Sequence, residues 1–135
     1  MLKLSKKSEY ALMAARYMAI KNHGTAITAK EIANNFNLSY ELISKVLQSL
    51  SKNQIVNSYK GVKGGYILSK SPADIPLIDL IRAVEPDYQI VDCLGYENRK
   101  EVCSYEENCT IKYPLAMVQQ KIDKVFFETK LSHII

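Results

Sequence analysis

Apolar residues recur at helical spacing in five segments of the chain. The first segment spans residues 6–22 and ends at Asn22-His23-Gly24. Its apolar positions are Tyr10, Leu12, Met13, Ala14, Tyr17, Met18 and Ile20. Because these positions cover much of the helix circumference, we expect this helix at the centre of the fold.

Two further helical segments each begin at a residue that can cap a helix. Thr28 opens a capping box with Glu31, in which the Thr28 hydroxyl accepts from the Glu31 backbone N–H and the Glu31 side chain reaches back. Ser39 opens a helix to about Asn53, and its apolar face consists of Leu42, Ile43, Val46, Leu47 and Leu50. Only Asn37-Leu38 separates the two helices, and the second helix has a polar face. This arrangement is typical of a helix-turn-helix.

Alternation of apolar and polar residues follows the second of these helices. Residues 55–60 and 66–69 predict two strands joined by a glycine-rich turn over residues 61–65. A hairpin directly after a helix-turn-helix makes a winged helix. Residues 77–84 predict a short helix, and Pro114 suits the first turn of a last helix. The apolar stripe of that last helix is Leu115, Val118, Ile122, Val125 and Phe126.

The predicted fold is therefore mostly α with a small β-hairpin. We expect a winged helix-turn-helix in residues 1–71, and a loop followed by a long C-terminal helix in residues 72–135. The stripe on the last helix needs a partner, which a two-fold dimer supplies.

Length and composition exclude several classes of protein. A chain of 135 residues that is 47% hydrophobic and 24% charged forms one compact domain, or one small domain plus an appendage, and is not wholly disordered. No apolar run approaches the ~20 residues of a membrane-spanning helix. Polar residues interrupt the N-terminal segment, so no secretory signal is expected and we predict a cytoplasmic protein. No catalytic triad, phosphate-binding loop or carboxylate pair is evident, so an enzyme is not expected.

The net charge of +4 is divided unevenly along the chain. Residues 1–71 contain 11 Lys and Arg against 3 Glu, whereas residues 72–135 contain 7 Lys and Arg against 11 Asp and Glu. The two parts therefore carry net charges of +8 and −4. The basic part suits a polyanionic partner, although an uneven solvated surface would give the same sums.

The polar face of the helix after Ser39 has the chemistry of a recognition helix in the DNA major groove. Lys45 and Gln48 can donate to purine acceptors, and Glu41 can accept from cytosine. On the wing, glycines allow close backbone approach and lysines supply cations for phosphates. The candidate DNA-binding residues are Thr28, Ser39, Tyr40, Glu41, Ser44, Lys45, Gln48, Lys60, Lys63 and Gly64.

The three cysteines lie in a stretch with little periodicity, residues 87–113. Cys93, Cys103 and Cys109 have the spacing C-x9-C-x5-C, which lets three thiolates on a loop converge on one soft metal centre. The residues alone leave four interpretations open: an iron–sulfur cluster, a zinc site, a thiol redox switch and buried structural cysteines.

Several segments together resemble the IscR/NsrR family of bacterial transcription regulators. They are Ser8-Glu9-Tyr10-Ala11-Leu12, Thr28-Ala29-Lys30-Glu31-Ile32-Ala33, Leu38-Ser39-Tyr40, Ile43-Ser44-Lys45-Val46-Leu47, Lys60-Gly61-Val62-Lys63-Gly64-Gly65-Tyr66 and Leu77-Ile78-Asp79-Leu80-Ile81-Arg82-Ala83-Val84-Glu85. The resemblance implies a dimeric winged helix that binds operator DNA, with a C-terminal helix that dimerises. It also implies a 2Fe-2S or 4Fe-4S cluster on Cys93, Cys103 and Cys109.

The resemblance leaves the fourth cluster ligand open. Some family members have a histidine three residues after the last cysteine, where this chain has Lys112, a poor ligand. Other members resemble this chain in having an acidic residue near the start of the first helix, donated from the partner subunit. Glu9 is at that position. The resemblance therefore implies Glu9 as the fourth ligand.

The sequence thus predicts a repressor or other regulator of transcription, a homodimer on double-stranded operator DNA, controlled by the iron–sulfur cluster. The signal would be redox state, nitric oxide or iron–sulfur supply. The alternative is an iron–sulfur carrier or assembly partner that uses the winged helix to bind protein.

Overall fold

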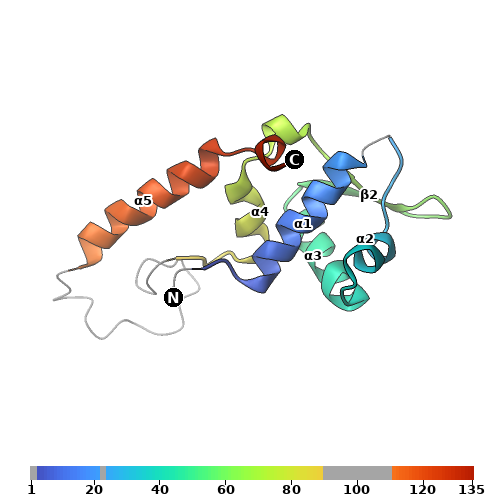
Figure 1. The fold of residues 1–135 in the computed structure, drawn as a ribbon, viewed down its shortest axis with the longest axis horizontal. Helices are drawn as coiled ribbons and strands as arrows, with labels where there is room; N and C mark the ends of the chain where they lie inside the picture. The colour runs from blue at the N-terminus through green and yellow to red at the C-terminus, as the bar shows by residue number, and fades with distance from the viewer. Residues whose placement is uncertain (1–2, 22–23, 90–110) are drawn as a thin grey trace.

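Helix α1 (Lys6–Ile20) lies at the centre of the fold, as its apolar pattern predicts (Figure 1). The structure is a computed structural model that describes residues 3–21, 24–89 and 111–135. Ala11, Ala14 and Ala15 on α1 are completely buried. These small side chains let α3 (Tyr40–Lys52) and α4 (Leu77–Val84) pack closely on α1, and both helices contribute to the same hydrophobic core.

The predicted helix starts are confirmed by their caps. The Thr28 hydroxyl accepts from the Glu31 N–H at 3.0 Å and opens α2 (Ala29–Phe36), and the Ser39 hydroxyl accepts from the Leu42 N–H at 3.5 Å and opens α3. The other half of the predicted capping box, in which the Glu31 side chain reaches back, is a wrong prediction. The Glu31 carboxylate accepts from the Tyr17 hydroxyl of α1 at 2.8 Å instead of reaching back to Thr28. A long-range partner has replaced the local one.

The wing is a two-stranded antiparallel hairpin. Strands β1 (Val56–Tyr59) and β2 (Gly65–Leu68) pair in a register that runs from Val56 opposite Leu68 to Tyr59 opposite Gly65. Ile27, just before α2, adds a bridge to this hairpin: its N–H donates to the Tyr66 carbonyl at 2.9 Å, and the Tyr66 N–H donates to the Ile27 carbonyl at 2.8 Å. The wing is therefore attached to the start of the helix-turn-helix.

The C-terminal end returns to the core, which the sequence did not predict. After α5 (Lys112–Glu128), the 3-10 helix η3 (Leu131–Ile134) places Leu131 in a fully buried position. The Leu131 N–H donates to the Ile75 carbonyl at 2.8 Å, just after the 3-10 helix η1 (Pro72–Asp74), and the Leu77 N–H donates to the Thr129 carbonyl at 2.9 Å. These bonds attach the segment that follows α5 to the residues at the start of α4.

The apolar stripe predicted on α5 is divided between two environments. Leu115, Ile122 and Phe126 are half-buried, and Phe126 packs against the core. Val118 and Val125 are 43% and 60% exposed, respectively. In Figure 1, α5 and the hairpin extend from opposite sides of the helical core. Within the described part of the chain, no helix combines the length and apolar character needed to cross a membrane.

The predicted fold class is confirmed: the chain is mostly helical, with a two-stranded hairpin in a winged helix-turn-helix and a C-terminal helix. The cysteine segment lies outside the described residues.

We expect Gly65→Ala to destabilise the protein more than Gly61→Ala. Both residues have positive φ values, +144° and +110°, which cost an alanine about 1–3 kcal/mol. A Cβ at Gly65 would also lie 2.7 Å from the Ile27 carbonyl oxygen, whereas one at Gly61 meets nothing within 4 Å. Urea unfolding followed by circular dichroism measures both free energies. Equal losses of unfolding free energy in the two variants would mean that the Ile27 backbone does not restrict the side chain at position 65.

Candidate nucleic-acid interface

Helix α3, the predicted recognition helix, presents one buried and one exposed face. Ile43, Val46, Leu47 and Leu50 are buried, so the opposite face points to solvent. On that face Tyr40 is 58% exposed, and Glu41, Lys45 and Gln48 are exposed. Ser44 is half-buried, and its hydroxyl accepts from the Gln48 amide at 3.2 Å. Since the two side chains are already joined, Gln48 is partly oriented before any ligand binds.

The turn before α3 fixes the angle at which this face is presented. Asn37 adopts the left-handed conformation with φ of 54°, which asparagine tolerates better than most residues. The Leu38 N–H then donates to the Ala33 carbonyl at 2.9 Å, and the Leu38 side chain packs against the core. Helix α2 is held in turn by the Tyr17–Glu31 hydrogen bond and an edge-on contact between the Tyr17 and Phe36 rings.

A hollow of about 420 Å³ lies between α3 and the wing. It brings together three of the predicted DNA-binding residues, Thr28, Tyr40 and Ser44. The sequence analysis did not select Lys30, Ser58 and Tyr59, which line the same hollow. Ser58 and Tyr59 are exposed strand residues, and only the folded hairpin places them opposite α3. We call this feature the wing-side hollow.

Lys45 and Gln48 lie on the other flank of α3, in a separate groove of about 410 Å³. Lys7, Leu42, Val46, Ser49, Lys52 and Val84 complete its lining. We call it the α1-side groove because Lys7 comes from the first turn of α1. The recognition helix is therefore bordered by a hollow on each side.

The wing tip carries the predicted basic residues. Lys60 and Lys63 are exposed, and Val62 between them is fully exposed. Gly64 has a structural role of its own: its N–H donates to the Gly61 carbonyl at 2.9 Å, and a Cβ there would lie 2.6 Å from the Tyr59 carbonyl oxygen. The turn thus requires a glycine at this position whether or not DNA approaches it.

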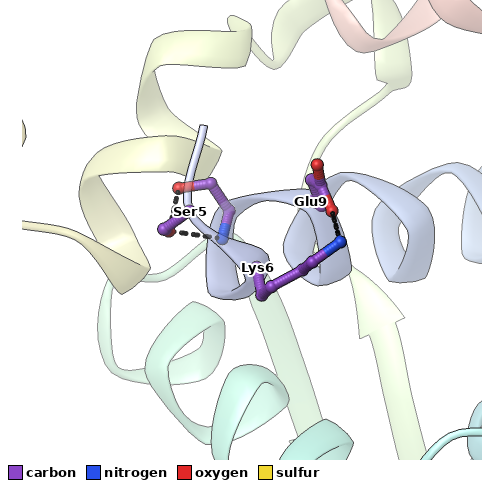
Figure 2. A network of polar contacts seen from close by, with 4 residues as sticks. Ser5, Lys6 and Glu9 are labelled. Atoms are coloured by element: carbon purple, nitrogen blue, oxygen red, sulfur yellow. Dashed lines mark hydrogen bonds and ion pairs between the residues drawn. The ribbon is translucent and has the colours of Figure 1, made fainter. Parts of the chain in front are cut away.

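The candidate metal ligand Glu9 lies in the first turn of α1, as Figure 2 shows. Its carboxylate pairs with Lys6 at 3.2 Å, and the Glu9 side chain is 45% exposed. Ser5 caps the same turn by accepting from the Ser8 N–H at 3.1 Å. Cys93, Cys103 and Cys109 lie outside the described residues, and within residues 3–21, 24–89 and 111–135 no three His, Cys, Asp or Glu side chains gather as a metal site.

A polar network lies where the described chain stops before the cysteines. The Tyr88 hydroxyl donates to Asp123 on α5, and Asp123 also accepts from Gln119 at 2.8 Å and pairs with Arg82 of α4 at 3.5 Å. Burial, and then the hydrogen bond to Asp123, raise the pKa of Tyr88 to about 12. The raised pKa extends the pH range in which the Tyr88 hydroxyl is a donor to Asp123, a bond that holds this segment to α5.

The pKa of Tyr17, on the helix-turn-helix side of the molecule, is raised in the same way. Its hydrogen bond to Glu31 raises the pKa of the Tyr17 phenol, with burial and the Glu31 charge adding to the effect. The Tyr17 phenol therefore stays neutral to a higher pH than an ordinary tyrosine, and its hydrogen bond joins α2 to α1.

Comparison with known proteins agrees with this architecture. Residues 4–135 match the Rrf2 family model, described as an iron-dependent transcriptional regulator. The transcriptional regulator NsrR of Bacillus licheniformis is 31% identical over 84% of this chain and 78% of its own length.

Two solved structures are similar over nearly the whole chain. CymR, the global cysteine regulator of B. subtilis, has a TM-score of 0.76 and 28% identity, covering 99% of this chain and 96% of its own. IscR of T. potens has a TM-score of 0.73 and 26% identity, covering 98% and 85%. The match to the family model and the identity to NsrR together establish that the chain belongs to the Rrf2 family of DNA-binding transcriptional regulators.

Proposed function

We propose that this regulator binds operator DNA as a homodimer and that an iron–sulfur cluster on Cys93, Cys103 and Cys109 controls that binding. The observation that carries the DNA-binding part is the exposed face of α3 between the wing and α1. The family is one of transcriptional regulators, not enzymes, and this favours DNA over the carrier role.

The division of labour on DNA follows from the two kinds of exposed group. Gln48, Lys45 and Glu41 on α3 would meet base edges in the major groove, where amide and ammonium donors and a carboxylate acceptor discriminate between base pairs. Lys60 and Lys63 at the wing tip would meet phosphates, which position the protein without reading sequence. Thr28, Ser39, Tyr40 and Ser44 supply hydroxyls beside α3, and Gly64 shapes the wing.

The homodimer is supported by the exposed apolar residues of α5. Ile111, the N-cap of α5, and Val118 and Val125 on the helix are 56%, 43% and 60% exposed and recur every seven residues. This period keeps them on one side of the helix, where a second copy of α5 can cover them. A two-fold dimer would present two α3 helices to a palindromic operator.

The cluster is supported by the family description and by the donor chemistry of the chain. Three thiolates and one carboxylate form a ligand set that iron accepts. The Glu9 carboxylate fits this role because, among the described residues, its ion pair is with an exposed lysine. Exposed ion pairs of this kind contribute roughly 0–1 kcal/mol, so a metal would displace Lys6 at little cost. When bound, such a cluster supplies a redox-active centre whose loss changes the local charge and order.

A thiol redox switch is the second candidate, favoured by the structural similarity to CymR of Staphylococcus aureus, whose structure is that of an oxidized form. It would use the same three cysteines without iron. The two candidates differ in metal content, which makes them separable by composition alone.

We expect Gln48→Ala to lower affinity for a specific operator by about 1–3 kcal/mol, or roughly 5- to 150-fold. An operator selected from random duplexes and a mixed-sequence duplex would be titrated by fluorescence anisotropy. Gln120→Ala, an exposed amide on α5, is the matched control. Because Gln48 is expected to read bases, the mixed-sequence affinity should change little. Equal losses on both duplexes would remove Gln48 from base readout.

We expect Cys93→Ala to lose its iron and acid-labile sulfide when purified without oxygen. The wild-type protein under the same conditions should contain both, and its visible absorption should disappear in the variant. If the wild type contains zinc but no sulfide, the cluster proposal is wrong and the cysteines form a zinc site. Absence of any metal, with reversible oxidation of the cysteines, would favour the thiol switch.

We expect Glu9→Ala to keep the cysteine ligands but to change the visible and resonance Raman spectra of the anaerobic protein. Oxygen ligation leaves one iron more labile, so the variant should also release iron to a chelator at a different rate. Glu128→Ala, which removes another exposed carboxylate paired with a lysine at 3.9 Å, serves as the control. Spectra identical to those of the control would exclude Glu9 as a ligand.

A further inference from the structure

The α1-side groove holds three lysines that come from two helices. Lys7 is in the first turn of α1, and Lys45 and Lys52 lie two turns apart on α3. All three are exposed. Across the described part of the chain, no hydrogen bond or ion pair joins any of them to an acidic side chain, whereas the neighbouring Lys6 pairs with Glu9. The groove is therefore a concentration of uncompensated positive charge.

The dipole of α1 does not favour a lysine at position 7. The N-terminal end of a helix carries a partial positive charge, which disfavours a cation in the first turn. Lys6 offsets this through Glu9, but Lys7 has no such acidic partner among the described residues. Lys52, in the last turn of α3, is placed favourably for its own helix. An unfavourably placed lysine that lines a basic groove suggests an anionic ligand for the groove.

The position of the groove identifies that anion. A helix with its side chains is about 10–12 Å across, and the major groove is about 12 Å wide. A recognition helix therefore fills the major groove, and its two flanks meet the two sugar–phosphate backbones. The wing-side hollow borders one flank of α3, and the α1-side groove borders the other.

We propose that the α1-side groove binds the phosphate backbone on the side of the major groove away from the wing, with Lys7 and Lys52 as its phosphate contacts. This proposal rests on the proposed DNA binding of α3 and adds a second backbone strand to it. Lys45 then lies at the border between base edges and phosphates, since it lines this groove and shares the exposed face with Gln48. Helix α1 thereby becomes part of the DNA-reading surface.

The test is the salt dependence of binding to a mixed-sequence duplex of about three helical turns. Log K falls linearly as log salt concentration rises, and we call the steepness of this fall the slope. Each lost phosphate contact lowers this steepness by about 0.9. Lys7→Gln and Lys52→Gln should each lower the slope by about 0.9 for every subunit that contacts the duplex. Each variant should also weaken binding to the selected duplex and to the mixed duplex by the same factor. Lys7→Arg should retain the wild-type slope. Lys124→Gln, whose lysine is 74% exposed on α5, is the charge-matched control.

The outcomes separate this proposal from the function on which it rests. If Lys7→Gln and Lys52→Gln keep the wild-type slope while Lys60→Gln lowers it, DNA binding stands and the groove proposal is overturned. If the slope falls equally in Lys124→Gln, only net charge matters, and the groove proposal is also overturned. If the wild type shows no salt-dependent binding to any duplex, the proposed function itself fails. Thermal melting of each variant verifies that the fold is intact.

Discussion

The close packing around α1 is the interaction on which the rest of the molecule depends. Ala11, Ala14 and Ala15 leave no exposed surface, and α3 and α4 approach the helix on this small-residue face. The same helix holds α2 through the Tyr17 hydroxyl and the C-terminal end through Arg16, whose Nε donates to the Ile134 carbonyl at 2.8 Å. Larger side chains at the three alanines would therefore push α3 and α4 away from α1.

The parts of the proposed DNA-reading surface are held in place by different contacts. The turn between α2 and α3 is fixed by the left-handed Asn37 and the Leu38 hydrogen bond. The wing is fixed by the two hydrogen bonds between Ile27 and Tyr66, and Gly65 permits this close approach. Both constraints are made by backbone atoms, so neither uses the exposed side chains of α3 or of the wing tip.

The first turn of α1 and its N-cap border two separate cavities. Lys7 lines the groove beside α3, whereas Ser5 and Ser8 line a different cavity of about 590 Å³. That second cavity is also lined by Tyr88, which is bonded to Asp123, and by Phe126 of α5. Residues of this one helical turn therefore line both the groove beside α3 and the cavity beside α5.

The sequence alone determined the elements whose cause is local. The caps at Thr28 and Ser39, the periodicity of α3 and the glycine-rich turn of the wing all act within a few residues, so the winged helix-turn-helix could be predicted from them. Only the tertiary structure decided the partner of Glu31, the burial of Leu131 against the start of α4, the division of the α5 stripe, and the place of Lys7 beside α3. Each of these depends on residues far apart in the chain, whose meeting is set by how the helices pack around α1 and not by any local preference.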